Sequence, residues 1–269
     1  LFLLHMLSKM QPEADGGCRF GIVLNGSPLF TGGAGGGESE IRRYLLEHDL
    51  VEAIVALPTD MFFNTGIATY VWVVSNRKPK ARKGKTQLID GSTFFRKMRK
   101  SLGSKRREIG EQDRETLVKL FGDGEPMDIV TLLNADGKEI DRSTITPDAP
   151  TPDAPEGGKA KRAPVSLVLP NEAFGYHQIT VERPLLNEYG EPVLVTRGKN
   201  KGEPQPDAAL RDTETVPLTE EIDSYFEREV LPHVPDAWID ESKTKVGYEI
   251  PFNRHFYVFE PPRPLAEID

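Results

Sequence analysis

The chain has 269 residues, of which 38% are hydrophobic and 28% charged, with a formal net charge of −8 and a single cysteine. This length permits one large or two modest domains, and the lone Cys18 excludes a disulfide framework and favours the cytoplasm. Because no apolar run approaches roughly 18 residues and the five histidines lack metal-ligand spacing, we expect neither a membrane span nor a metal site.

The first part of the chain predicts a helix and three strands. Residues 1–10 are apolar but lack the basic region and cleavage site of a signal peptide, so we expect an amphipathic helix. Because the chain does not begin with Met, we expect this helix to be cut from a longer protein. Apolar, β-branched stretches at 18–24, 50–57 and 67–74 predict strands, and the first is typical of a buried central strand.

The connections between these strands predict their directions. Residues 38–49 have helical spacing of apolar side chains, so the strands on either side should be parallel with a right-handed crossover. The next connection, residues 58–66, is too short for a crossover helix. The third strand should therefore be antiparallel, and the fold class is α/β.

Later segments are less regular. Residues 86–92 predict a strand that leads into helical sequence ending near 111–121, and residues 126–164 predict a linker whose 141–164 portion is rich in Pro, Ala, Asp and Gly. Beyond it, we expect strands at 176–182 and 191–197.

A helix should follow over 219–231, with Thr219 as N-cap and Ile222, Phe226 and Val230 on one face. Residues 261–269 are typical of the start of another helix.

A glycine-rich segment, residues 31–37, precedes the helix at 38–49 and raises the question of a cofactor loop. A nucleotide-binding loop leaves its strand directly, whereas residues 25–30 intervene here. The dinucleotide pattern and the Lys-Ser/Thr of a phosphate loop are also missing. We therefore expect a flexible loop without a cofactor.

The charge is unevenly distributed. Residues 77–107 carry thirteen Lys and Arg against one acidic residue, whereas the segments on either side are acidic. Such a run is either a solvated connector or a surface that faces phosphates, and composition alone leaves both open.

Residues 25–78, "NGSPLFTGGAGGGESEIRRYLLEHDLVEAIVALPTDMFFNTGIATYVWVVSNRK", closely resemble the modification (M) subunit of type I restriction–modification systems. The segments "LIDGS", "FGYHQITVERPL" and "YEIPFNRHFYVFEPPRPL" resemble the C-terminal region of that family. The resemblance implies an S-adenosylmethionine-dependent adenine-N6 DNA methyltransferase. Its partners would be double-stranded DNA, a specificity (S) subunit and a restriction (R) subunit.

The resemblance also implies a fold and a division of the chain. The three strands would be the fifth, sixth and seventh of a Rossmann-like methyltransferase sheet, the last antiparallel, followed by a mixed α+β C-terminal extension. Residues 1–125 would complete a catalytic domain, 126–164 would be the linker, and 165–269 would contact another subunit. The family's F-x-G-x-G cofactor loop and Asn-Pro-Pro-Phe/Tyr motif are missing from this sequence. We therefore expect no catalytic, cofactor-binding or metal-binding residue here, and a chain inactive alone.

The resemblance points to a pocket for the target base. Flipped bases are held by aromatic stacking, and an aromatic residue before the seventh strand contributes in related enzymes. The pocket candidates include both Phe63 and Phe62; we expect one ring in the pocket and the other in the core, and favour Phe63 for the pocket, with Asn64 and Thr65 able to hydrogen-bond nearby. Asn25, at the end of the first strand, is either part of this site or a turn residue.

Contacts with DNA phosphate and with other subunits are the remaining expectations. For phosphate we expect the cations Arg77, Lys78, Lys80, Arg82 and Lys83. Arg42 and Arg43 would either bind phosphate or pair with glutamates on the helix surface, the commoner case. The C-terminal aromatics would be core or interface: Trp238, Phe252, Phe256, Tyr257 and Phe259.

The alternative is a non-catalytic DNA-binding or subunit-interaction module. Sequence upstream of Leu1 distinguishes the two hypotheses, because F-x-G-x-G and Asn-Pro-Pro-Phe motifs there would establish the enzyme.

Overall fold

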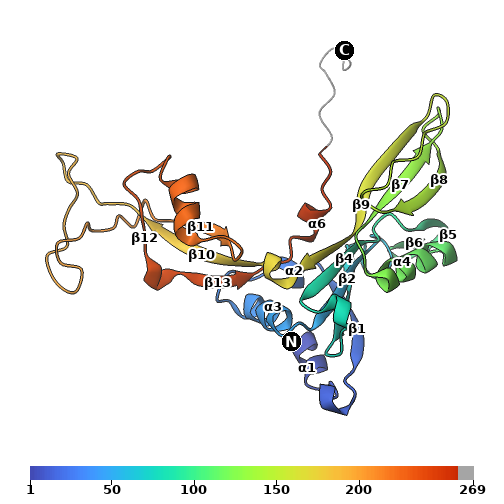
Figure 1. Cartoon of the computed structure of the whole chain (residues 1–269), viewed down its shortest axis with the longest axis horizontal. Helices are drawn as coiled ribbons and strands as arrows, with labels where there is room; N and C mark the ends of the chain where they lie inside the picture. Colours follow the sequence, from blue (N-terminus) through green and yellow to red (C-terminus); the bar gives the residue numbers. More distant parts are fainter. Residues whose placement is uncertain (260–269) are drawn as a thin grey trace. The chain divides into compact units, whose positions relative to one another are not determined.

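The computed structural model describes residues 1–259, which form two compact units (Figure 1). Unit one contains Leu1–Leu29, Asp49–Pro170 and the residues from Pro251 onward, and unit two contains Phe30–His48 and Asn171–Ile250. The expected division at residues 125 and 164 into functional domains stays a prediction. The expected helix at 261–269 lies outside the described residues.

Unit one is built on a seven-stranded, mostly antiparallel sheet in the order β1-β3-β2-β4-β9-β7-β8. Its strands are β1 (Arg19–Asn25), β2 (Val51–Leu57), β3 (Thr69–Ser75), β4 (Lys85–Asp90), β7 (Met127–Leu133), β8 (Glu139–Ile145) and β9 (Lys159–Pro170). Short helices lie outside it: α1 (Phe2–Leu7), α6 (Phe252–His255) and the 3-10 turns η1 (Glu13–Asp15) and η2 (Lys80–Arg82). Helix α2 (Ser27–Phe30) follows β1.

The first three strands confirm the predicted directions. β3 pairs antiparallel with both β1 and β2, so β1 and β2 run parallel to each other with β3 between them. The sequence predicts β1 as a buried central strand, whereas among the described residues it is an edge strand along which alternate residues are exposed. The buried strands are β2 and β3, where Ile54 and Trp72 have no exposed surface.

The linker expected at 126–164 is wrong for most of its length. This segment contains β7 and β8, which form an antiparallel pair, and the first residues of β9, which pairs with both β7 and β4. Figure 1 shows the three strands side by side. Residues 146–158, the Pro- and Asp-rich part, and the short turn at 134–138 lie between strands and have neither helix nor strand of their own. Ile129 and Thr131 on β7 are β-branched residues that favour a strand, although the composition of residues 126–164 as a whole is typical of a linker.

Helix α4 (Glu111–Asp123) covers part of this sheet, as the sequence predicts. Leu117 and Leu120 of α4 pack on Ile89, Phe94 and Val165 in one hydrophobic cluster. The helix ends at Gly124, whose φ of 67° is a left-handed conformation that glycine adopts without strain.

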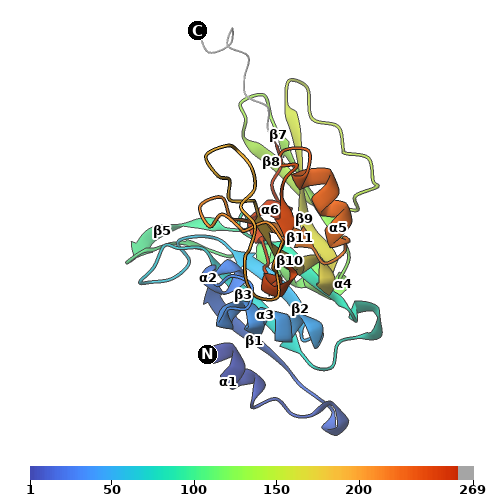
Figure 2. The ribbon, with the colours of Figure 1, turned by 90° about the vertical axis from the view of Figure 1, so that its left-hand side faces the viewer.

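Residues 96–108 form a hairpin where helical sequence was expected. Its strands are β5 (Arg96–Leu102) and β6 (Lys105–Glu108), joined by a turn at Gly103 and Ser104. The hairpin projects outward in Figure 2. The helix expected to end near 111–121 therefore begins only at Glu111.

Unit two is a small antiparallel sheet with helices. Its strands are β10 (Gly175–Glu182), β11 (Asp212–Pro217), β12 (Trp238–Ile239) and β13 (Lys245–Tyr248), and β10 pairs with the other three. Its helices are α3 (Gly37–Glu47) and α5 (Ile222–Tyr225), with the π-helical turn η4 (Phe226–Val230) and the 3-10 turns η3 (Asn171–Phe174) and η5 (Glu241–Lys243).

Two local expectations in unit two are wrong. The strand expected at 191–197 is replaced by isolated bridges, among them Leu186 with Pro192 and Leu194 with Pro204. The N-cap of the predicted helix is Glu221 and not Thr219, so the helix begins at Ile222. The apolar face is confirmed, because Phe226 and Val230 are buried with Ile222 packed against them.

Within residues 1–259 no helix is both long enough and apolar enough to cross a membrane.

Candidate functional site

The loop between β2 and β3 carries the two phenylalanines that the sequence predicts at a base pocket. We call residues 58–66 the aromatic loop. An isolated bridge joins Phe62 and Thr65, and the Asp60 amide donates to the Gly66 carbonyl over 3.3 Å. Asp60 has a φ of 60°, an uncommon conformation for a residue with a side chain. The loop is therefore a closed turn with a defined shape.

The side chains of this loop differ in exposure. The ring of Phe63 is 70% exposed, whereas Phe62 is half-buried. Asn64 is exposed, and the Thr65 hydroxyl accepts a hydrogen bond from the Ile67 amide over 3.3 Å. An exposed ring beside a polar amide offers a stacking surface, so base contact by Phe63 and Asn64 stays a prediction.

Asn25 lies at the same end of the sheet as the aromatic loop. It is the exposed last residue of β1 and is paired with Thr69, where the chain leaves the loop and enters β3. The carboxyl ends of β1, β2 and β4 meet at this edge, since the three strands run in one direction. Such edges of α/β sheets are where ligands commonly bind.

The β5–β6 hairpin is attached to the aromatic loop by several hydrogen bonds. The Ser104 amide donates to the Phe63 carbonyl over 2.8 Å, and the Arg106 and Arg107 amides both donate to the Asp60 carbonyl, over 2.9 and 3.2 Å. The Arg107 guanidinium also donates to the Thr59 hydroxyl over 2.8 Å.

The sequence did not predict this contact between loop and hairpin. The one sequence feature that indicates a hairpin here is the segment "LGSK" between two basic runs, which is typical of a hairpin turn.

Two of the five cations expected at phosphate are engaged within the protein, which corrects that expectation for them. The side chain of Lys78 is 1% exposed and donates to Asp49 and to the Lys85 carbonyl. Burial lowers the pKa of Lys78, and Asp49 opposes that effect. This ammonium is unavailable to DNA.

Arg82 is the second internal cation. Its guanidinium lies 4.8 Å from the centre of the Phe121 ring and donates to the carbonyls of Phe121 and Gly122. It also pairs with the buried carboxylate of Glu52, which Arg19 contacts too. Replacing it would disturb packing.

The other three cations of the expected set, Arg77, Lys80 and Lys83, are exposed. For them phosphate contact stays a prediction.

The glycine-rich segment is held by Arg42, which we expected either at DNA phosphate or in a pair with a glutamate on the helix surface. The buried Arg42 donates to the carbonyls of Thr31 and Gly32, over 2.8 and 3.0 Å, and to the Tyr248 carbonyl. Its guanidinium therefore faces the loop's own carbonyl groups. Neither phosphate binding nor a surface pair describes Arg42, and its hydrogen bonds hold the loop that we expected to be flexible. Arg43 does pair with Glu40 and Glu47 on the helix surface, as predicted.

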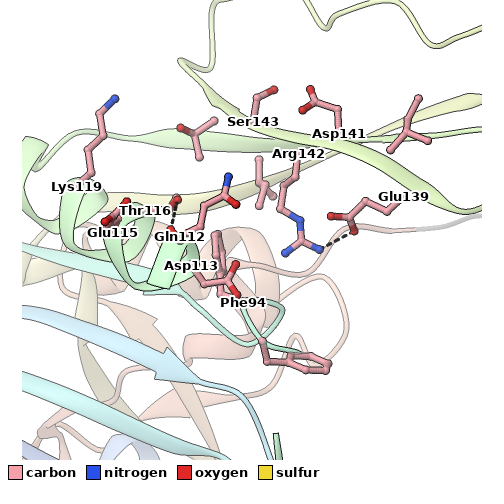
Figure 3. Close-up of a pocket in the computed structure, with 14 residues that line it drawn as sticks. Phe94, Gln112, Asp113, Glu115, Thr116, Lys119, Glu139, Asp141, Arg142 and Ser143 are labelled. Atoms are coloured by element: carbon pink, nitrogen blue, oxygen red, sulfur yellow. Dashed lines mark hydrogen bonds and ion pairs between the residues drawn. The ribbon is translucent and has the colours of Figure 1, made fainter. Parts of the chain in front are cut away.

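A pocket of about 710 Å³ lies between α4 and β8 (Figure 3). Arg142 crosses it and donates to Glu139 over 2.8 Å and to the Thr93 carbonyl over 3.0 Å. Carboxylates outnumber cations in the lining, which includes Asp113, Glu115 and Asp141. This acidic lining disfavours a polyanionic ligand.

The C-terminal aromatics divide between core and surface. Phe252 is 3% exposed and packs on Tyr70 with ring centres 5.2 Å apart, so it is a core residue. Trp238 and Phe256 are half-buried. Tyr257 and Phe259 are 70% and 68% exposed, so they are the two that remain candidates for an interface.

The described residues hold no group of three or more His, Cys, Asp or Glu side chains placed to bind a metal ion. The Glu182 carboxylate of unit two is paired with the cations Lys243 and Arg211. Although burial acts to raise the pKa of Glu182, hydrogen bonds from Lys243 and Arg211 lower it. Both cations contact its Oε1 atom, whereas the buried Oε2 atom has no hydrogen-bond partner among the described residues.

Comparisons with known proteins agree in naming one kind of protein. The family model described as N-6 DNA Methylase matches residues 1–145. A type I restriction enzyme methylase subunit of Methanocaldococcus jannaschii (MjaVII) is 34% identical over 110 residues, which cover 41% of this chain and 18% of the relative. The corresponding subunit of Mycoplasma pneumoniae (MpnII) is 36% identical over 100 residues, 37% of this chain and 17% of the relative.

Among solved structures, the type I restriction–modification methyltransferase subunit of Streptococcus thermophilus is 28% identical. The match covers 46% of this chain and 24% of that one, with a TM-score of 0.38. In each comparison the matched part is less than a quarter of the relative's length.

Proposed function

Because the chain belongs to the N-6 DNA methylase family, we propose that it is the C-terminal part of the M subunit of a type I restriction–modification system. The complete subunit would transfer a methyl group from S-adenosylmethionine to the N6 atom of adenine in a specific DNA site. Its partners would be double-stranded DNA and the specificity and restriction subunits, in the cytoplasm.

The observation that carries this proposal is the direction of β3. The resemblance assigns β1, β2 and β3 as the fifth, sixth and seventh strands of a methyltransferase sheet, with the last antiparallel. Both pairings of β3 are antiparallel, and β1 and β2 run parallel to each other. The aromatic loop precedes β3, where the resemblance puts the base pocket.

The outer edge of β1 supports the same assignment. Within residues 1–259 no strand pairs with that edge, and an unpaired edge presents backbone groups that accept another strand. In our proposal the earlier strands of the methyltransferase sheet pair here.

The role of this chain in the reaction is to hold the target base. Phe63 would stack on the adenine that has left the duplex, with Asn64 and Asn25 as hydrogen-bonding groups at the same sheet edge. The half-buried ring of Phe62 would anchor the loop, next to the backbone bridge between Phe62 and Thr65.

The methyl donor does not fit the glycine-rich segment of this chain. Arg42 fills that segment with a guanidinium bound to the Thr31 and Gly32 carbonyls, and a cation there opposes a positively charged sulfonium.

The test compares two variants of the complete methyltransferase. Phe63→Ala should slow methylation while leaving affinity for S-adenosylmethionine unchanged, since base stacking contributes roughly 1–3 kcal/mol. Phe62→Ala should instead lower the melting temperature, with a cost below the roughly 3–5 kcal/mol of a fully buried ring. Exchanged phenotypes would assign the pocket to Phe62, and destabilisation by both variants would contradict the pocket.

A second candidate is a non-catalytic module that binds DNA or another subunit. The exposed rings of Tyr257 and Phe259 favour it, because exposed aromatic residues are typical of interfaces. Sequence upstream of Leu1 without the F-x-G-x-G and Asn-Pro-Pro-Phe/Tyr motifs would favour this candidate over the enzyme.

A further inference from the structure

We propose that the β5–β6 hairpin is a DNA-backbone clamp that holds the phosphates beside the base bound by the aromatic loop. This inference rests on the proposed function, and it assigns phosphate contact to the hairpin part of the basic run, which lies outside the five cations that we expected at phosphate. It is argued from the charge of the hairpin, from the lack of carboxylate partners for most of its cations, and from its attachment to the loop that carries Phe63.

The hairpin is densely cationic. Between residues 96 and 108 it carries seven Lys and Arg and one acidic residue: Arg96, Lys97, Arg99, Lys100, Lys105, Arg106, Arg107 and Glu108. Glu108 is paired with Arg96, with 2.9 Å between Oε1 and Nε. A short strand pair with this composition cannot be explained by core packing, because its side chains are mostly exposed.

Most of these cations have no ionic partner in the part of the chain that the structure describes. Lys97, Arg99, Lys100 and Arg106 are exposed, and no ion pair involves them or the half-buried Lys105. Clustered like charges repel one another unless an anion binds among them. A polyphosphate backbone supplies such anions at regular spacing.

The β5 strand also forms a recess. A register irregularity lies between Lys97 and Leu102, where β5 departs from regular pairing with β6. A recess of about 470 Å³ opens there, lined by Arg96, Lys97, Met98, Arg99, Lys100 and Glu108. Bulged strands redirect side chains, and here four of the six lining residues are cations. The recess can take a phosphate group.

The attachment to the aromatic loop gives the cations a defined position. The Ser104 amide contacts the Phe63 carbonyl, and two amides of β6 contact the Asp60 carbonyl. The Arg107 guanidinium lies 4.1 Å from the centre of the Phe95 ring, which fixes the base of the hairpin. The hairpin turn and the Phe63 ring are close enough that a Cβ on Gly103 would lie 3.2 Å from that ring. Phosphates bound by the hairpin would thus flank the flipped base.

The first test neutralises the free cations. In the assembled methyltransferase, Lys97→Gln, Arg99→Gln, Lys100→Gln and Arg106→Gln are combined, and affinity for a random-sequence DNA duplex is measured across a salt series. Each lost phosphate contact reduces the log–log salt slope by roughly 0.9, so the slope should fall by about 3 to 4. Target preference should not change, since phosphate contacts carry no sequence information.

The matched control removes the same charge elsewhere in unit one. Lys119, Lys138, Lys159 and Lys161 are exposed and lie outside the basic run, and their combined change to Gln should leave the slope unchanged. An unchanged slope in the hairpin variant, or an equal fall in both variants, would overturn the inference.

The second test separates attachment from charge. Gly103 has a φ of 61°, and a Cβ there would lie 2.5 Å from the Phe63 carbonyl oxygen. Gly103→Ala should therefore move the turn off the loop, keeping the cations and the salt slope but slowing methylation of unmethylated, enzymatically amplified DNA. A wild-type methylation rate in this variant would overturn the coupling.

The wild-type methylation rate distinguishes a failure of the proposed function from a failure of the clamp. If the wild-type assembly does not methylate this DNA, the proposed function is contradicted. If the wild type methylates and the hairpin variant keeps its slope, only the clamp is contradicted.

Discussion

Arg42 and Arg43 are neighbours in the sequence, yet their side chains have opposite environments. Arg42 is 2% exposed and donates to three backbone carbonyls, and burial lowers its pKa, whereas Arg43 lies on the surface between Glu40 and Glu47. Helical periodicity puts adjacent residues about 100° apart, so only one of the two can face the core. The periodicity of the sequence did not show whether Arg42 or Arg43 faces the core.

The first prediction follows from this difference. Arg42→Ala removes a donor from the Thr31, Gly32 and Tyr248 carbonyls, and loss of a hydrogen bond to a buried group such as Tyr248 costs roughly 1–3 kcal/mol of unfolding free energy. Urea unfolding followed by circular dichroism should show this loss. Arg43→Ala is the matched control and should leave the midpoint unchanged; equal losses would mean that Arg42 does not hold the loop.

The second prediction concerns pH. Burial raises the pKa of Tyr248 to about 12, and the nearby Glu47 carboxylate adds to the effect. The unfolded tyrosine ionises near its ordinary value of about 10, so it releases its proton at a lower pH than the folded one. The resulting stability is present below about pH 10 and is lost as pH rises from about 10 through about 12.

Tyrosinate absorbance during alkaline titration measures this. Tyr248→Phe should remove the late-titrating phenol, and Glu47→Gln should bring its pKa down. A Tyr248 that titrates with the exposed tyrosines would contradict the buried contact.

At the scale of elements, the sequence predicts what apolar patterning determines. β2 and β3 are continuous apolar runs rich in β-branched residues. Such runs favour a buried strand. The hairpin at 96–108 was missed because Lys and Arg have low strand propensity, and it is held by contacts with Thr59 and Asp60 far away in the sequence. β7 and β8 were missed because their neighbouring Pro- and Asp-rich residues dominated the composition.

The basic run at residues 77–107 also shows that the sequence alone does not determine which side chains are internal. Its thirteen cations are indistinguishable in the sequence, but the structure divides them into internal ones, such as Lys78 and Arg82, and exposed ones. Whether a cation is internal depends on carboxylates such as Asp49 and Glu52, which lie on other elements. The aromatic loop could be predicted as a candidate because its two rings precede a strand, whereas its attachment to the hairpin could not.

The exposed cations of residues 77–83 give the third prediction. Changing Arg77, Lys80 and Lys83 together to Gln should reduce the salt slope of DNA binding by about 2 to 3 if all three contact phosphate, without altering thermal stability. Arg82→Gln should do the reverse, lowering the melting temperature because Glu52 loses a partner. An unchanged slope in the triple variant would make residues 77–83 a solvated connector and leave the hairpin as the phosphate-binding part of the run.

At the scale of the whole molecule, the chain is organised as two units whose segments interleave in the sequence. Residues 30–48 belong to the same unit as residues 171–250. A cut between residues 164 and 165 would therefore separate α3 from β13, against which it packs. Expression of 165–269 alone should give a less protected β10–β13 pair in hydrogen exchange than the intact chain gives; equal protection would contradict the grouping.

In our proposal, this chain supplies the base-holding and DNA-holding part of an adenine-N6 methyltransferase, and the catalytic motifs belong to another part of the complete subunit. The direct measurement is incorporation of labelled methyl groups from S-adenosylmethionine into unmethylated DNA, followed by identification of the modified base. The chain alone should transfer none and should bind the donor weakly or not at all. The complete M subunit, assembled with its specificity subunit, should produce N6-methyladenine. Methyl transfer or tight donor binding by the isolated chain would contradict the account, as would an assembled enzyme that leaves adenine unmodified.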